Sequence, residues 1–71
     1  MSSYAVIIEG DGNSYSGYVP DLPGCVATGE SVDEVDARIR DAVALHIESL
    51  RAHGEPVPEA TTAAIRTVDF A

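Results

Sequence analysis

The chain has 71 residues, with 12 acidic side chains against four arginines and no lysine, and a formal charge of −8. A chain of this length forms one small domain, residues 1–71. Folding of such a domain buries only about 60% of the surface that the unfolded chain exposes. The charge argues against direct binding of nucleic acid, which depends on Lys and Arg contacts to phosphates. It favours a basic protein partner, or it serves solubility alone.

The single cysteine excludes an internal disulfide, so we expect a homodimer or larger oligomer to supply the missing stability. The amino terminus has no signal-peptide pattern, and no apolar stretch is long enough to cross a membrane. We therefore expect a soluble cytoplasmic protein with no membrane contact.

Three short strands are predicted in the first part of the chain. Residues 4–9 are β-rich and apolar on both alternations, which favours a central strand. The turn residues 10–13 lead to a returning strand over 14–19, in which Gly17 indicates a weak point or a bulge. Residues 25–28 form the third strand.

A stiff corner, residues 18–25 (Tyr-Val-Pro-Asp-Leu-Pro-Gly-Cys), joins the second and third strands. Pro20 and Pro23 each fix φ, and Pro23-Gly24 suits the centre of a type II turn. We expect the corner to present Asp21 to solvent and to turn Leu22 inward. A rigid loop is also a common contact site, because little entropy is lost when it binds.

A long helix is predicted over residues 32–53. Ser31 and Glu34 form a capping box at its start, and Gly54 with Pro56 marks its end. Apolar residues recur at three- and four-residue spacing and form one stripe: Val32, Val35, Ile39, Val43, Ile47 and Leu50, with His46 among them. Residues 64–70 alternate imperfectly and indicate a last strand. The fold expected is α+β, with three N-terminal strands and one C-terminal strand in a small antiparallel sheet packed on the long helix.

The order of these motifs closely resembles the HicB-like antitoxin family, the small partners of HicA-type ribonuclease toxins. Pro-Asp-Leu-Pro-Gly-Cys at 20–25, Gly-Glu-Ser at 29–31, the acidic helix and Glu-Pro-Val-Pro-Glu at 55–59 carry the resemblance, which covers residues 4–70. It implies a partial ribonuclease-H-like fold and a protein that masks a small basic mRNA-cleaving toxin. Longer relatives carry a DNA-binding module that this sequence does not show, so autorepression is not inferred.

No residue pattern indicates catalysis, a cofactor or a metal. Cys25 follows a tight turn, away from the histidines that would activate it, and is interpreted as a buried structural cysteine. His46 and His53 are two helical turns apart, too far to chelate one metal unaided. Ribonuclease H chemistry needs carboxylates converging on two divalent cations, yet residues 6–8 in the middle of the first strand are Val-Ile-Ile.

Three hypotheses follow: an antitoxin without enzymatic activity, a stand-alone regulatory or ligand-binding module, and a degenerate metal-dependent nuclease. The antitoxin reading is preferred. Its predicted partner contacts are the corner and the start of the helix, namely Tyr18, Asp21, Leu22, Asp33 and Asp36.

Overall fold

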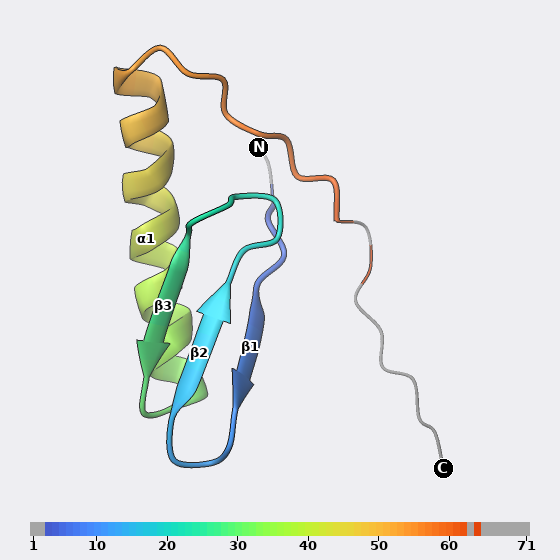
Figure 1. Ribbon diagram of the computed structural model, residues 1–71, viewed down its shortest axis with the longest axis vertical. Helices are drawn as coiled ribbons and strands as arrows, with labels where there is room; N and C mark the ends of the chain where they lie inside the picture. The colour runs from blue at the N-terminus through green and yellow to red at the C-terminus, as the bar shows by residue number, and fades with distance from the viewer. Residues whose placement is uncertain (1–2, 63, 65–71) are drawn as a thin grey trace.

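A computed structural model describes residues 3–62 and 64 of the chain (Figure 1). Strands β1 (Ile7–Gly10), β2 (Tyr15–Tyr18) and β3 (Val26–Gly29) form an antiparallel sheet in the order β1-β2-β3. Helix α1 (Val32–Ala52) packs on one face of this sheet. The α+β class, the three strands and the helix are confirmed, although β1 begins at Ile7 rather than at residue 4.

The strand register follows from the turn between β1 and β2. The Asp11 carboxylate accepts hydrogen bonds from the backbone amides of Asn13 (2.9 Å) and Ser14 (3.0 Å), and Gly12 adopts a φ of 94°. This side-chain turn sets Ile8 opposite Gly17, and Gly17 in turn lies opposite Ala27. One inward-facing row therefore crosses the three strands.

Helix α1 is capped at both ends, as the sequence predicts. The Ser31 hydroxyl accepts a hydrogen bond from the Glu34 amide at 3.0 Å. At the other end, Gly54 has a φ of 67°, and its amide and that of Glu55 return to the carbonyls of Arg51 and Leu50. No helix within residues 3–62 is long and apolar enough to span a bilayer.

The core lies between the sheet, the corner and the first half of α1. Its buried side chains are Val19, Leu22, Cys25, Val35 and Ile39. Gly17 marks no bulge, because β2 keeps its register with both neighbours. It marks a close approach instead: a Cβ at this position would lie 2.7 Å from Cγ1 of Val35.

Two expectations about the sheet need comment. Among the described residues β1 is an edge strand rather than a central one, since only β2 pairs with it. Tyr4, Val6 and Ile8 pack against the core, which accounts for one of its apolar faces. The predicted strand 64–70 lies outside the described residues apart from Ala64, and three strands with one helix do not by themselves show a ribonuclease-H-like arrangement.

The other edge of the sheet, β3, lies beside an arginine. The Arg38 guanidinium donates to the Thr28 carbonyl at 2.6 Å and pairs with the Glu34 carboxylate at 3.1 Å. The same carboxylate accepts from the Glu30 amide at 3.2 Å, so Glu34 joins the end of β3 to the helix instead of returning to the Ser31 amide. A backbone acceptor of β3 is therefore occupied by a charged side chain.

Candidate partner-binding surface

The sheet face opposite α1 carries an apolar row. Side chains alternate along a strand, and Ile8, Gly17 and Ala27 face the helix. Their neighbours Ile7, Tyr18 and Val26 are paired across the strands and face the other way. We call these three residues the outer row. Tyr18 is 39% exposed and Val26 is 64% exposed, so the row offers apolar surface to a partner.

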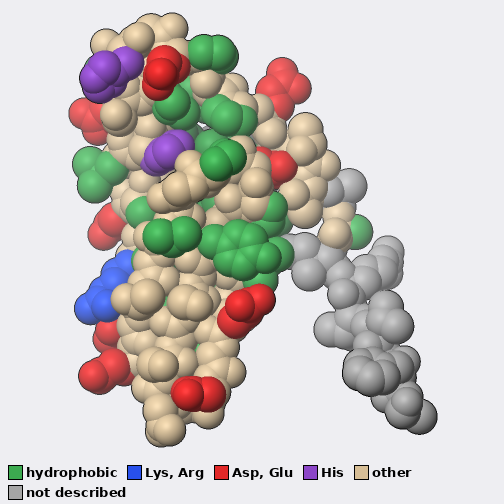
Figure 2. All heavy atoms as spheres, in the orientation of Figure 1, with side chains coloured by type: hydrophobic (Ala, Val, Ile, Leu, Met, Phe, Trp, Pro, Cys, Tyr) green, Lys and Arg blue, Asp and Glu red, His purple; other side chains and the backbone are tan. Residues whose placement is uncertain are grey.

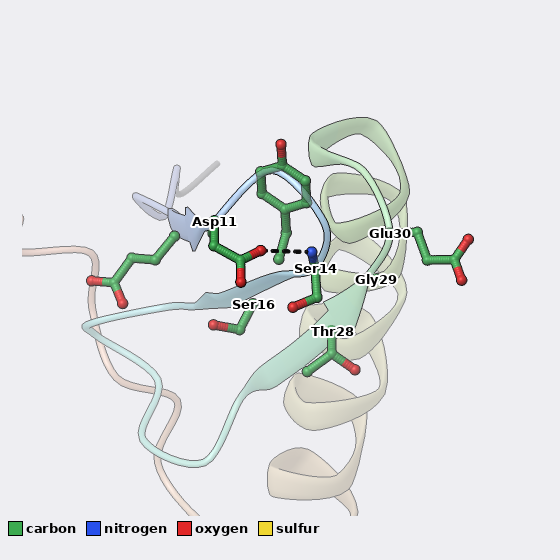
Figure 3. A pocket seen from close by; sticks show the side chains of 9 residues that line it. Asp11, Ser14, Ser16, Thr28, Gly29 and Glu30 are labelled. Atoms are coloured by element: carbon green, nitrogen blue, oxygen red, sulfur yellow. Dashed lines mark hydrogen bonds between the residues drawn. The ribbon is translucent and has the colours of Figure 1, made fainter.

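The next row on this face is polar and leads into a shallow hollow. Glu9, Ser16 and Thr28 pair across the strands below the outer row. Together with the turn and the end of β3 they line the hollow, whose labelled residues are Asp11, Ser14, Ser16, Thr28, Gly29 and Glu30 (Figure 3). Asp11 points toward Ser14, and Glu30 lies at the rim with its carboxylate directed outward. Hydroxyls and the Tyr15 side chain thus line the hollow, and three carboxylates, those of Glu9, Asp11 and Glu30, belong to its lining residues.

The corner is a closed double turn. The Leu22 amide donates to the Val19 carbonyl and the Cys25 amide to the Leu22 carbonyl, each at 3.1 Å, and the Val19 amide closes the loop on the Cys25 carbonyl. Gly24 has a φ of 86°, as the predicted type II turn requires. Leu22 has no exposed surface, so it turns inward as predicted and anchors the corner to the core.

Asp21 on this corner binds another part of the same chain. Its carboxylate accepts hydrogen bonds from the Thr61 hydroxyl (2.8 Å) and from the backbone amides of Thr61 (3.2 Å) and Thr62 (3.1 Å). We call this contact the corner latch. The Thr61 hydroxyl is the main reason why the pKa of Asp21 lies below its ordinary value, with the Thr62 amide adding to it. The hydroxyl of Tyr4 also donates to the Pro58 carbonyl, so the segment after α1 runs back across the end of the sheet (Figure 1).

The two helix carboxylates predicted to contact a partner lie elsewhere. Asp33 is exposed in the first turn of α1, and Asp36 pairs with Arg40 at 2.9 Å. Strand β3 separates the corner from the start of α1, a distance of about 13 Å for four residues. The structure therefore does not bring Asp21 together with Asp33 and Asp36. Tyr18 lies on the outer face, and Leu22 is buried beneath the corner.

The groups considered for catalysis remain apart. Cys25 is 3% exposed, and burial raises the pKa of its thiol, which disfavours the reactive thiolate. The His53 ring lies 2.7 Å from the Ser49 carbonyl at the end of α1. Within the described residues no group of three or more His, Cys, Asp or Glu side chains could hold a metal ion.

Sequence reasoning found Tyr18 but not its neighbours on the outer row. The sequence indicates a strand for Val26 but not its face, and it places Ile7 on one face of the first strand without indicating a neighbour on the next strand. The signal that could have found them is the pairing of Tyr18 with both residues, which depends on the strand register. Alternation along the first strand places Glu9 on the same face as Ile7, and the strand register makes it part of the polar row.

Comparison with known proteins gives one family and several relatives. Residues 4–69 match a family model described as a HicB-like antitoxin of bacterial toxin–antitoxin systems. A UPF0150 protein of Thermoplasma acidophilum is 41% identical over 56 residues, which cover 78% of this chain and 81% of that protein. A UPF0150 protein of Synechocystis is 36% identical over 58 residues, covering 80% of this chain and 73% of the relative.

A longer relative comes from Haemophilus phage HP1. It is an uncharacterized 14.9 kDa protein of the rep–hol intergenic region, 32% identical over 56 residues that cover 79% of this chain but only 42% of the phage protein. No solved structure shows a significant match.

Proposed function

This chain belongs to the HicB-like antitoxin family of bacterial toxin–antitoxin systems, and on that premise we propose that it binds and masks a small basic HicA-like ribonuclease toxin. The match over residues 4–69 is the observation that carries the proposal. In this proposal the chain acts in the cytoplasm as a homodimer or larger oligomer, and it neutralises the toxin by covering it rather than by catalysis.

The charge distribution supports a basic partner. The formal charge is −8, and two of the four arginines are paired with carboxylates of their own helix, Arg38 with Glu34 and Arg40 with Asp36. Other carboxylates, such as those of Asp41 and Glu48, are exposed along α1. A field of this sign attracts a basic protein and accelerates its association.

The residues predicted from the sequence to contact the partner differ in how readily they can do so. Tyr18 and Asp33 are exposed and can meet a partner without rearrangement. Asp21 and Asp36 would have to exchange intramolecular hydrogen bonds for intermolecular ones, and Leu22 would contribute by holding the corner in shape.

The experiment is to search the genes beside that of this chain for one that encodes a small basic protein, and to express that protein alone and together with this chain. We expect growth arrest and mRNA cleavage with the first protein alone, and recovery of both when this chain is present in excess. Unchanged mRNA cleavage by the purified toxin at a stoichiometric excess of this chain would contradict the proposal. Metal-dependent cleavage of RNA by this chain alone would instead favour the nuclease hypothesis.

Salt dependence gives a second test. Exposed charges more than about 10 Å apart are largely screened at 0.1 M salt. We therefore expect the association rate with the toxin to fall by about tenfold or more between low and high salt, while the dissociation rate changes less. Stopped-flow fluorescence measures both rates, and a salt-independent association rate would contradict the steering argument.

A further inference from the structure

We propose that the outer face of the sheet receives the basic partner: an apolar side chain of the partner packs on the outer row, and a neighbouring Lys or Arg reaches the carboxylates around the hollow. This inference rests on the proposed function and adds to it the surface and the chemistry of the contact. The face consists of the outer row, Ile7, Tyr18 and Val26, and of Glu9, Asp11 and Glu30 around the hollow.

The apolar half of this face is exposed in a way that packing among residues 3–62 does not explain. The core of the domain lies on the other side of the sheet, between the strands and α1. In the part of the chain that the structure describes, the exposed large hydrophobic residues are Tyr18, Val26, Val32 and Leu45, and the first two are direct neighbours across β2 and β3. Figure 2 shows hydrophobic side chains gathered on this side over the end of the sheet that lies next to the corner. A tyrosine beside a β-branched side chain is a good anchor for a partner, because it offers contact area at little cost in conformational entropy.

The polar half gives the outer face its negative charge. Glu9 and Glu30 are exposed, and neither carboxylate takes part in a described hydrogen bond or ion pair. Asp11 accepts hydrogen bonds from two backbone amides through a single oxygen, Oδ1. No arginine lines the hollow within the described residues, and Arg38, beside Thr28, is held by Glu34 and the Thr28 carbonyl.

The same charges argue against a second copy of this chain as the occupant. Two identical outer faces in contact would bring carboxylates of like sign toward each other, and each such pair costs free energy. A partner carrying Lys or Arg beside an apolar side chain satisfies both halves of the face. The carboxylates at the rim remain partly solvated, so they serve orientation and association more than affinity.

Two variants of matched exposure test the apolar half. Val26→Arg places a large cation on the outer row at a site that is 64% exposed, and Leu45→Arg places the same cation on α1 at a site that is 67% exposed. The toxin is the one that this chain neutralises in the co-expression experiment described above. The affinity of each variant for that toxin is measured by biolayer interferometry. We expect Val26→Arg to weaken binding by at least tenfold and Leu45→Arg to change it less than threefold.

A second pair tests the acidic half with two variants that undergo the same change of net charge. The double variant Glu9→Lys/Glu30→Lys changes the hollow, and Asp41→Lys/Glu48→Lys makes the same change of charge on the exposed side of α1. Both should slow association, because both weaken the overall field. Only the first should also raise the dissociation rate, by about fivefold or more, because only it removes contacts made in the complex. Circular dichroism and urea unfolding establish that all four variants are folded.

The outcomes separate this inference from the proposed function. If the parent chain neutralises the toxin but each variant binds it as its matched control does, the outer face is not the interface and the antitoxin function stands. If Val26→Arg abolishes self-association in light scattering while toxin affinity is retained, the face joins copies of this chain and the inference is overturned. If the parent chain does not bind the toxin at all, the proposed function and this inference both fail.

Discussion

Replacing Gly17 by alanine tests how closely the sheet approaches the helix. The added Cβ would lie 2.7 Å from Val35 Cγ1, 3.3 Å from Ile39 Cγ1 and 3.4 Å from Ile8 Cγ1. Carbon atoms pack at about 3.5–4.0 Å, so the contact with Val35 is about 1 Å too short. The Val35 side chain is fully buried and has a single side-chain torsion, so it cannot swing into solvent.

Overpacking of this kind costs about 1–3 kcal/mol, and the lower entropy of unfolded alanine offsets about 0.4–1 kcal/mol of that. We therefore expect Gly17→Ala to lower the free energy of unfolding by about 0.5–2 kcal/mol. With a urea m-value of about 1 kcal/mol/M, the midpoint should fall by about 0.5–2 M. Urea unfolding at a fixed protein concentration measures this. A variant as stable as the parent would refute the packing argument.

The source of the strain can be located with a second substitution. Val35→Ala removes both Cγ atoms, so in that background Gly17→Ala should cost little or nothing, with a coupling energy of about 1 kcal/mol. Trimethylamine N-oxide keeps the destabilised variants in a measurable range. An equal cost of Gly17→Ala in both backgrounds would show that Val35 is not the clashing side chain.

Three further predictions concern the core, the corner latch and the helix cap. Ile39→Ala should cost about 2–5 kcal/mol because Ile39 is buried, whereas the half-buried Ile47 should cost clearly less; urea unfolding compares them. Asp21→Ala should speed hydrogen exchange of the Thr61 amide without affecting the core, because alanine has no side-chain acceptor for that amide. The latch lowers the Asp21 pKa below its ordinary value of 3.8, so the stabilisation by the latch is fully present above pH 3.8 and is lost as the pH falls through the pKa of the folded state. The Thr61 amide should therefore lose its protection from hydrogen exchange in acid, and this acid-induced loss should be absent in Asp21→Ala. Ser31→Ala should lower thermal stability by about 1 kcal/mol, and an unchanged melting temperature would contradict the capping role.

Local signals in the sequence predicted most of the fold. Ser31 and Gly54 bound the helix through contacts to residues three to five positions away, and Gly24 fixes the corner through its own φ. Two prolines constrain the corner around Leu22 and so predict that this side chain turns inward. Each of these features depends on a few neighbouring residues, which a sequence displays directly.

The candidate surface was less predictable because it depends on pairing between strands. Val26 joins Tyr18 only through the register of β2 and β3, and a shift by one residue would move it to the other face. The partner of Asp21 is 40 residues away in the sequence, at Thr61, and no local pattern indicates it. Asp21 therefore looked like a free carboxylate on a rigid loop, although it closes the latch.

The arginine beside β3 bears on how this sheet can aggregate. An open strand edge is a template for adding further strands, and a sheet with two open edges can grow into a fibre. Here the Arg38 guanidinium occupies the Thr28 carbonyl, so a strand added at β3 would first have to displace a charged side chain. Among the described strands the other edge is β1, and growth from β1 alone joins two copies edge to edge and leaves no free template, which ends the assembly at a closed pair. Removing this guanidinium with Arg38→Ala would leave both edges of the three described strands, β1 and β3, open to a further strand.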